Sequence, residues 1–444
     1  MEYIKNKFYE SAQACLKDFN ELKSKYSNVV IGNVTIGDVI SGMKGVPSLI
    51  TETSKLDPEE GIRFRGYSLP ELRKILPQLP SHGEPLPEAL FYLMLIGEVP
   101  ELDDVNNLSK DWASRAHVPQ HVFDVLEAMP RNSRPMAQFT AAVISMASES
   151  YFMNAQIAGV NKKFYWDTTY EDVMNLIARL PRIAAYIYRR SFHKGVHIDP
   201  DPRLDWAANF AHMMGFKDPS VQRLMRLYMS IHADHEGGNV TSHTTHLVAS
   251  TLSNPYYSFA AGMLGLAGPL HGFANQNVLN WIYDMIRELG DEDPSEEKII
   301  KYCKKFLKEG GIIPGYGHAV LRQTDPRFIA QKEFAEKFIK NDTLINIVNK
   351  LYNVVPPLLE ATGKVKNPWP NVDAYSGALL KYYGIKEHNF YTVMFGVSRS
   401  LGVMSTLLFD RIFGLPIERP TSYPLKWYLD VAKGKINPDN AIHE

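Results

Sequence analysis

Residues 237–283 contain no Asp, Glu, Lys or Arg, although these four types make up 22% of the chain. Because charged side chains are almost never fully buried unless paired, we expect this stretch to be buried on nearly all sides. It is not a membrane span, since polar residues fill its first part and Asn254-Pro255 interrupts it before about 20 apolar residues accumulate. The stretch therefore predicts helices packed inside a domain or a subunit interface, with Gly262 and Gly265 letting a second helix approach closely.

The length and charge of the chain restrict its organisation and its ligands. With 444 residues it is too long for one ordinary core, so two domains are expected. Lys plus Arg (48) and Asp plus Glu (49) nearly cancel, which argues against a nucleic acid or a membrane surface as the main partner and favours a small ligand. Cys15 and Cys303 are widely separated, which is typical of a reducing compartment. The first residues resemble neither a signal nor a transit peptide, so any targeting segment has been removed or never existed.

The hydrophobic periodicity is helical almost throughout. Apolar residues in 5–26 recur at three- and four-residue steps and predict an amphipathic helix. Two short β-branched segments flank Gly32-Asn33 and predict a hairpin over 29–36. Further helices are predicted at 86–96, 108–129, 136–148, 170–192, 204–216, 221–236, 257–267, 296–309, 325–340, 344–359, 376–383 and 389–413. The predicted fold class is mainly α with a small β-hairpin near the N-terminus.

Four histidines form the first polar cluster. His232 and His235, then His243 and His246, repeat a His-x2-His spacing that resembles a metal-ligand pattern. No cysteine or clear carboxylate completes such a site, so hydrogen bonding at helix ends is the favoured interpretation.

A second cluster is rich in glycine. Residues 310–318 hold four glycines, and Arg322 and Arg327 follow. Such a loop can present N–H groups to a phosphate or a base, although no Walker pattern is present and a purely structural turn explains it equally well.

Two single residues complete the candidates. Asp373 stands just before an apolar helix, where a carboxylate is either a helix N-cap or a reactive group. Arg399 interrupts the apolar run 392–409, where an unpaired guanidinium would be costly, so an anionic partner is implied. Arg419, between Glu418 and Pro420, is on local sequence alone an ordinary surface residue.

Together, these clusters resemble the citrate synthase family from about Val29 to Pro420. The most specific segments are 57–66, 232–239, 268–272, 314–322, 367–373 and 396–399. The long N-terminal helix and the lack of regulatory insertions resemble the dimeric, eukaryotic type. The resemblance implies a two-domain helical fold. The large domain would comprise 1–272, with the dimer interface, and 381–444, which reaches the partner subunit; the small, mobile domain that binds coenzyme A would be 273–380.

The resemblance also implies roles for individual residues. His271, His318 and Asp373 would be catalytic. Oxaloacetate would be bound by His235, Arg327, Arg399 and, from the partner subunit, Arg419; arginine forks suit a dicarboxylate. Coenzyme A would contact Lys44, Lys162, Ile312, Ile313, Gly315, Gly317, Arg322, Lys366 and Asn371. Lys44 and Lys162 stand where relatives often carry Arg, and Tyr375 where many carry His; we assign Tyr375 no role.

The implied reaction condenses acetyl-CoA with oxaloacetate and hydrolyses citryl-CoA to citrate, the entry step of the tricarboxylic acid cycle. The enzyme would be an acyltransferase that needs no metal or cofactor beyond its thioester substrate. A homodimer in the mitochondrial matrix is expected, with the cytoplasm as the alternative. A 2-methylcitrate synthase that uses propionyl-CoA would share all these residues. The sequence also leaves open a metal-dependent hydrolase built on the four histidines, or a non-catalytic helical scaffold.

Overall fold

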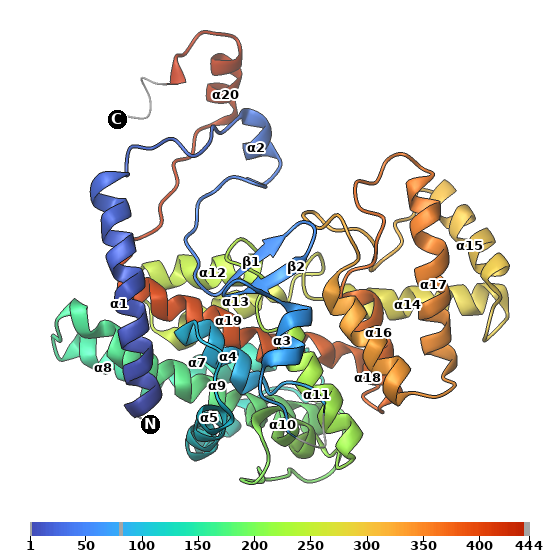
Figure 1. The fold of residues 1–444 in the computed structure, drawn as a ribbon, viewed down its shortest axis with the longest axis horizontal. Helices are drawn as coiled ribbons and strands as arrows, with labels where there is room; N and C mark the ends of the chain where they lie inside the picture. Colours follow the sequence, from blue (N-terminus) through green and yellow to red (C-terminus); the bar gives the residue numbers. More distant parts are fainter. Residues whose placement is uncertain (1, 80–82, 439–444) are drawn as a thin grey trace.

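The computed structural model describes residues 2–79 and 83–438 of the chain. Helices make up 62% of it, and its described residues form one sheet of three short strands. Most helices gather in one body, and a smaller group that includes α15 and α17 lies to its right in Figure 1. The predicted mainly α class is confirmed.

The hairpin predicted around Gly32-Asn33 is wrong. Residues 27–53, all of them described, contain no strand. The apolar side chains of the predicted hairpin are exposed: Val29 60%, Val30 79%, Ile31 73% and Val34 55%. Instead, Thr35 and Asp38 form a reciprocal capping box that begins the short helix α2 (Ile36–Ile40). Two exposed segments cannot hold a hairpin in water without a covering layer.

The small β element lies further along the chain. It consists of the antiparallel strands β1 (Ser54–Asp57), β2 (Gly61–Phe64) and β3 (Tyr67–Ser68). Ser54 pairs with Phe64, and Asp57 pairs with Gly61 across a tight turn. Ile62 and Phe64 are fully buried, so this hairpin has the apolar support that the earlier segment lacks.

The main body is built from helices that the sequence largely predicted. They are α1 (Glu2–Lys25), α3 (Leu69–Ile75), α4 (Pro87–Ile96), α5 (Leu102–Arg115), α6 (Gln120–Ala128), α7 (Pro135–Ser145), α8 (Tyr151–Ile157), α9 (Tyr165–Ser191), α10 (Trp206–Met214), α11 (Pro219–Ile231), α12 (Val240–Ser250), α13 (Pro255–Leu266) and α19 (Tyr391–Phe413). Short 3-10 turns, Met146–Glu149, Lys162–Phe164 and His388–Phe390, precede or follow some of them. The helix predicted over 108–129 is in fact two, because Pro119 restricts Val118 to an extended backbone and separates α5 from α6.

The central helix of the body is α19. It packs against α9, α11, α12 and α13, and every residue in it except Phe395 is buried. By length and composition, residues 388–413 could cross a membrane, but 94% of the apolar window is buried inside the protein. This helix is therefore the core of the fold, and its burial explains its apolar character.

The second helix group comprises α14 (Ala274–Leu289), α15 (Glu296–Lys308), α16 (Pro326–Phe338), α17 (Thr343–Glu360) and α18 (Asp373–Tyr382). In it, α14 packs on α18, α15 on α17, and α16 and α17 on α18. Apart from the last two residues of α18, the group falls inside the segment 273–380 that we predicted as the small domain. The division into 1–272, 273–380 and 381–444 stays a prediction.

The charge-free stretch forms α12 and α13, which pack closely. A Cβ on Gly262 would lie 2.1 Å from Thr245 Oγ1, and one on Gly265 would lie 3.0 Å from a methyl of Val240, so the predicted close approach is confirmed. Five large apolar side chains of the stretch are exposed in the single chain, so burial inside a subunit interface stays a prediction. The exposed side chains are Val240, Leu247, Tyr257, Leu264 and Leu270.

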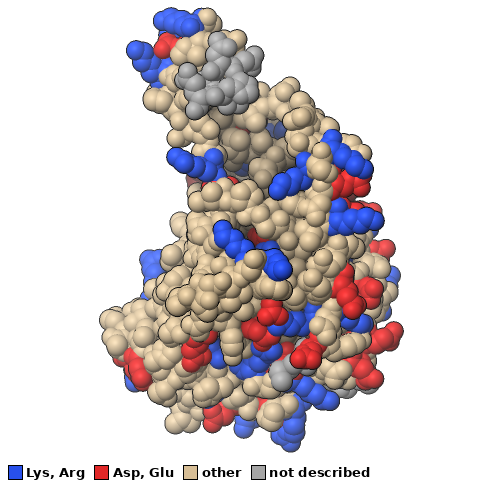
Figure 2. All heavy atoms as spheres, turned by 90° about the vertical axis from the view of Figure 1, so that its left-hand side faces the viewer, with Lys and Arg blue, Asp and Glu red and all other residues tan. Residues whose placement is uncertain are grey.

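Two segments project from the body, around α2 and around α20 (Leu425–Ala432), and lie together at the top of Figure 1. Figure 2 shows this projection standing above the body with a hollow beneath it. Acidic and basic side chains intermingle over the lower part of that face, in keeping with the balanced composition.

Candidate active site

Apart from Arg419, the predicted catalytic and oxaloacetate-binding side chains converge between the two helix groups. The imidazole rings of His235 and His318 have their centroids 5.6 Å apart. Burial lowers the pKa of His235 well below its ordinary value, and the charges of Arg327, Arg399, His318 and His271 lower it further. Residues from five separate segments therefore act on one another electrostatically, as expected for a single site. The Nε2 atom of His235 is buried and lacks a hydrogen-bond partner among the described residues, so it is free for a ligand.

His271 lies in the tight turn between α13 and α14. Gly272 permits this turn, since a Cβ there would lie 2.2 Å from the carbonyl oxygen of Leu266. Nε2 of His271 lies 2.7 Å from the hydroxyl of Thr241, in the first turn of α12. Burial, aided by the charge of Arg399, lowers the pKa of His271 to about 4. The imidazole is therefore neutral at pH 7 and can donate a hydrogen bond.

His318 lies in the loop before α16, and its tautomer is fixed by the backbone. The N–H groups of Val320 and Leu321 donate to its Nδ1 atom at 3.0 and 3.2 Å. An atom that accepts two hydrogen bonds carries no proton, so in the neutral ring the proton lies on Nε2. Burial, with Arg327 adding to it, lowers the pKa of His318 to about 4. The loop thus presents a neutral Nε2–H donor.

Asp373 is the first residue of α18, and Val372 occupies the N-cap position without a side-chain cap. The N-cap interpretation of Asp373 is therefore wrong. Burial raises the pKa of Asp373 to about 6, because the charge of Asp325 acts in the same direction and the opposing charges of Arg327 and Arg399 do not cancel it. A carboxylate with a pKa this close to neutral is a stronger base than an ordinary aspartate.

Two buried guanidinium groups form the anion site. Asp325, the N-cap of α16, accepts from Nε and Nη2 of Arg327 at 3.0 and 2.7 Å. Arg399, 1% exposed, donates instead to neutral acceptors, from Nε to the carbonyl of His232 at 3.0 Å and from Nη1 to Asn239 Oδ1 at 3.2 Å. Asp234 and Asp373 supply nearby negative charge, and an anionic ligand between the two guanidinium groups would add to it.

Phe395 is a site residue that we did not predict from the sequence. Its ring centroid lies 6.4 Å from that of His271 and 5.2 Å from that of His232, and Cζ of Arg399 lies 4.8 Å from it. The signal was available, since residues four apart on a helix share a face and an aromatic ring there attracts a guanidinium.

The glycine-rich loop is tied to the segment before Asp373. Gly315 and Gly317 have φ values of +82° and +89°, which favour glycine. The N–H of Asn371 donates to the carbonyl of Gly315 at 2.9 Å, and its Nδ2 donates to the carbonyl of Gly317 at 3.2 Å. A Cβ on Gly315 would lie 3.0 Å from Ala374, the neighbour of Asp373. The loop is therefore packed directly against the start of α18.

The other residues predicted to bind coenzyme A from this side surround the same loop. Ile313 is buried and Ile312 is 83% exposed. Nη1 of Arg322 donates to the carbonyls of Val320 and Leu321 at 2.7 and 2.8 Å, so the guanidinium is held against its own turn. Lys366 is exposed in the loop that leads to Asn371. These residues can offer charge and an apolar edge to a ligand at the loop.

Lys44, Lys162 and Arg419 lie apart from this site within one chain. Lys44 follows α2 in the projecting part, and Lys162 lines a cavity of about 370 Å3 beside Gly414 and Ile417. Arg419 is exposed on the chain that leads to α20. Their predicted ligand contacts stay predictions.

The four histidines do not assemble into a metal site. His232 caps the end of α11, with Nδ1 2.9 Å from the carbonyl of Tyr228, which confirms the helix-end interpretation for this residue. His243 and His246 contact Glu418 and Asp410. Across residues 2–79 and 83–438, no group of three or more His, Cys, Asp or Glu side chains is placed to hold a metal ion.

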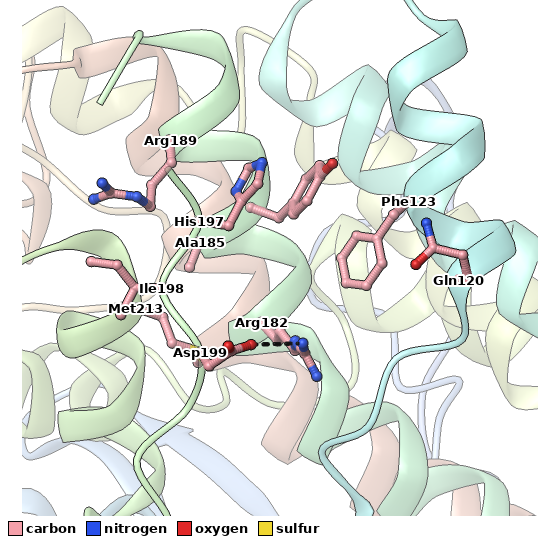
Figure 3. A pocket seen from close by; sticks show the side chains of 10 residues that line it. Gln120, Phe123, Arg182, Ala185, Arg189, His197, Ile198, Asp199 and Met213 are labelled. Carbon is pink, nitrogen blue, oxygen red and sulfur yellow. Dashed lines mark hydrogen bonds and ion pairs between the residues drawn. The ribbon is translucent and has the colours of Figure 1, made fainter. Parts of the chain in front are cut away.

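A separate cavity of about 240 Å3 lies among α6, α9 and the loop before α10 (Figure 3). The rings of Tyr186 and His197 stack in it at 3.6 Å, and Arg182 pairs with Asp199 at 3.1 Å. None of the predicted site residues lines this cavity, so we do not place the chemistry there.

Comparison with known proteins agrees with this geometry. The family model described as "Citrate synthase, C-terminal domain" matches residues 42–421. The chain is 54% identical over 407 residues to citrate synthase 4, mitochondrial, of Arabidopsis thaliana, covering 92% of this chain and 86% of the relative. It is 53% identical over 411 residues to the mitochondrial citrate synthase of Kajikia audax, covering 92% and 87%.

Solved structures give the same result. The citrate synthase of Pyrobaculum aerophilum superposes with a TM-score of 0.74 at 28% identity, covering 87% of this chain and 95% of that one. A citrate synthase from Thermoplasma acidophilum shares the fold, with a TM-score of 0.72 at 24% identity and coverage of 86% and 95%. This chain belongs to the citrate synthase family and is an acyltransferase of that family.

Proposed function

We propose that the chain condenses acetyl-CoA with oxaloacetate and hydrolyses the resulting citryl-CoA to citrate and free coenzyme A. The observation that carries this proposal is the combination of one basic carboxylate, Asp373, with two neutral imidazoles, His271 and His318, beside buried arginines. Condensation of a thioester with a ketone needs these groups: a base for the methyl proton and a hydrogen-bond donor for each carbonyl oxygen.

Oxaloacetate is held by its two carboxylates. Arg327 and Arg399 lie close enough to act on the same histidine and the same aspartate, and Nε2 of His235 has an unused hydrogen-bonding position. A planar carboxylate fits an arginine fork in two places, which fixes the orientation of the ketone. In a homodimer, Arg419 of the second copy supplies a third guanidinium.

The first chemical step makes the nucleophile. Asp373 removes a proton from the methyl group of acetyl-CoA, and His271 hydrogen-bonds the thioester oxygen on which enolate charge develops. A neutral donor suits this role, because it stabilises the developing charge without a full positive charge having to be buried before the substrate binds. Since Thr241 engages Nε2 of His271, the Nδ1 atom is left for the substrate.

The second step forms the carbon–carbon bond. The enolate carbon attacks the ketone carbon of oxaloacetate, and the Nε2–H group of His318 donates its proton to the oxygen that becomes the citrate hydroxyl. The proton that Asp373 took from the methyl group then returns to Nε2 of His318, so both residues regain their starting charge. Water then adds to the thioester carbon of citryl-CoA, the carbon–sulfur bond breaks, and coenzyme A leaves as the thiol. Closure of the second helix group over the site delays water until condensation is complete.

Coenzyme A is a substrate in this scheme, and no further cofactor or metal is required. The loop 312–318 with Arg322, Lys366 and Asn371 offers its binding surface. A ternary complex with carboxymethyl coenzyme A and oxaloacetate is described for the Thermoplasma acidophilum relative, which supports the same pair of ligands here. Lys44 and Lys162 meet the phosphates only if a second copy brings them there.

We propose a homodimer whose two-fold interface includes α12 and α13. The exposed apolar side chains of these helices, Val240, Leu247, Tyr257 and Leu264, lie in a stretch without charge, and a second copy can cover them. Mitochondrial names of the relatives support the mitochondrial matrix as the location, with the cytoplasm as the alternative.

The test is release of free thiol from acetyl-CoA with and without oxaloacetate. Oxaloacetate-dependent release supports the proposal, and release that ignores oxaloacetate contradicts it. Propionyl-CoA in the same assay separates a 2-methylcitrate synthase, since room for one methylene group changes discrimination by about 1–3 kcal/mol.

A further inference from the structure

Glu418 anchors the chain at the point where it leaves the body, immediately before Arg419. Its carboxylate lies 2.7 Å from Nε2 of His243 and 3.8 Å from Nε2 of His246. Its backbone N–H donates to Ser250 Oγ at 3.0 Å. All three partners belong to one face of α12, because they follow one another at three- and four-residue steps. Glu418, at the point where the chain leaves the body, is therefore fixed to a single face of α12.

Helix α19 holds His246 and the end of α12 in place. Nδ1 of His246 lies 2.7 Å from the buried carboxylate of Asp410, and Arg411 donates to the carbonyls of Ala249 and Ser253 at 2.9 and 2.8 Å. Burial lowers the pKa of His246, but the hydrogen bond and charge of Asp410 and the charge of Glu418 outweigh it and raise the pKa above its ordinary value. The two carboxylates therefore stabilise the protonated form of this imidazole.

The same helix reaches the active site of its own chain. Asn239, the N-cap of α12, accepts from Arg399, and Thr241 in the first turn contacts His271. Helix α12 therefore contacts Glu418, where the chain leaves the body, and also Arg399 and His271 of the candidate active site.

We propose that Glu418, through His243 and His246, is a positioning residue that fixes the direction in which Arg419 leaves the body. It thereby sets how tightly the partner's site binds oxaloacetate. This inference rests on the proposed function, in which Arg419 completes the partner's site. An arginine on an unanchored chain must be ordered when the substrate binds, and that ordering weakens binding; an anchor one residue away removes most of the cost.

The first test is Glu418→Gln, which keeps the shape and removes the charge. We expect the KM for oxaloacetate to rise about tenfold, with kcat at saturation and the KM for acetyl-CoA within about twofold of wild type. Asp430→Asn is the matched control, because Asp430 is a carboxylate of the same C-terminal segment that pairs only loosely, at 3.7 Å, with Lys435. His243→Ala should raise the KM, and His243→Gln, which keeps a donor near the Nε2 position, should restore it. An unchanged KM in Glu418→Gln overturns the proposal.

A double-mutant cycle separates positioning from general weakening of the fold. On an Arg419→Ala background, Glu418→Gln should add no further increase in KM, because nothing remains to be positioned. The same increase on both backgrounds would show that Glu418 acts by another route. If Arg419→Ala leaves the KM unchanged while the wild type is active, the cross-subunit assignment fails as well, although the reaction itself stands.

Mixed dimers show on which site Glu418 acts. A dimer with His271→Ala in one chain has one live site, which uses His271 of the intact chain and Arg419 of the mutant chain. Glu418→Gln placed on the His271→Ala chain should raise the KM of that site, and Glu418→Gln placed on the intact chain should not. The opposite pattern would make Glu418 a residue of its own chain's site and overturn the proposal.

Discussion

The hydroxyl of Thr241 lies 2.7 Å from Nε2 of His271, so a neighbouring helix orients the imidazole. When the hydroxyl donates to Nε2, the ring proton lies on Nδ1 and remains available to a substrate oxygen. Because α12 packs on α13 through Gly262 and Gly265, the distance between these two groups is set by the contact of the two helix backbones.

Thr241→Val should lower kcat about 10- to 100-fold without loss of folded dimer, since the ring loses its orientation and tautomer preference. Thr241→Ser, which keeps the hydroxyl, should stay within a few-fold of wild type. Steady-state kinetics with a melting curve checks this. Equal activity in the Val and Ser variants would contradict the role of the hydroxyl.

Asp373→Asn should lose turnover by about 10²- to 10⁴-fold or more while still binding oxaloacetate, because the amide keeps the shape but cannot accept the proton. Burial raises the pKa of Asp373 to about 6, so the ionised carboxylate opposes folding above that pH, and the variant should melt no lower than wild type at pH 8. Near-native turnover would rule out Asp373 as the base.

The pH profile of kcat/KM should have an acid limb with an apparent pKa near 6. Asp373 must be ionised to act, so activity falls about tenfold for each pH unit below that value. His271 and His318 have pKa values of about 4 and stay neutral across this range, so they add no limb above pH 5. A profile that is flat from pH 5 to 8 would contradict this assignment.

Oxaloacetate alone should raise the melting temperature and slow proteolysis. Arg327 on α16 and Arg399 on α19 belong to different helix groups, so a ligand that binds both favours the closed, folded form. Malonate, a shorter dicarboxylate without the ketone, is a suitable comparison and should protect less. An unchanged melting temperature and an unchanged rate of proteolysis at saturating oxaloacetate would show that this ligand does not close the site.

Co-refolding of His271→Ala with Arg419→Ala should restore activity at low oxaloacetate, where neither variant alone is active. In a mixed two-fold dimer, one site receives His271 from one chain and Arg419 from the other, both intact. Random pairing makes roughly half the dimers mixed, so about a quarter of all sites should revive. Thiol release with verified heterodimers measures this, and no recovery would place Arg419 outside the partner's site.

Helix periodicity predicted most of the body, because each helix buries one face and carries its pattern in the sequence. The errors arose where burial decides the outcome. The apolar residues around Gly32-Asn33 fit a hairpin by type, but they project into solvent, and the strands formed instead at Ser54–Phe64, where Phe64 is buried. The burial of the exposed side chains of α12 and α13 stays a prediction, since a single-chain sequence does not say which chain supplies the covering surface.

The chemistry of the site was easier to predict than its geometry. Asp373, His271 and His318 stand in distinctive local sequences, but their pKa values depend on Arg327 and Arg399, which are distant in the chain. Phe395 was missed because an aromatic residue in an apolar helix looks like ordinary core. Only the fold shows that its ring lies beside His271.

The central position of α19 has an evolutionary consequence. The helix that fills the core of the body also carries Arg399, so a substitution that repacks the core moves this buried guanidinium, which we propose binds the substrate. Natural selection therefore acts on substitutions in this core through enzyme activity as well as through folding. Proteins of this family that adapt to heat or cold should accumulate substitutions first in the peripheral helices, and the sequence of α19 should stay conserved.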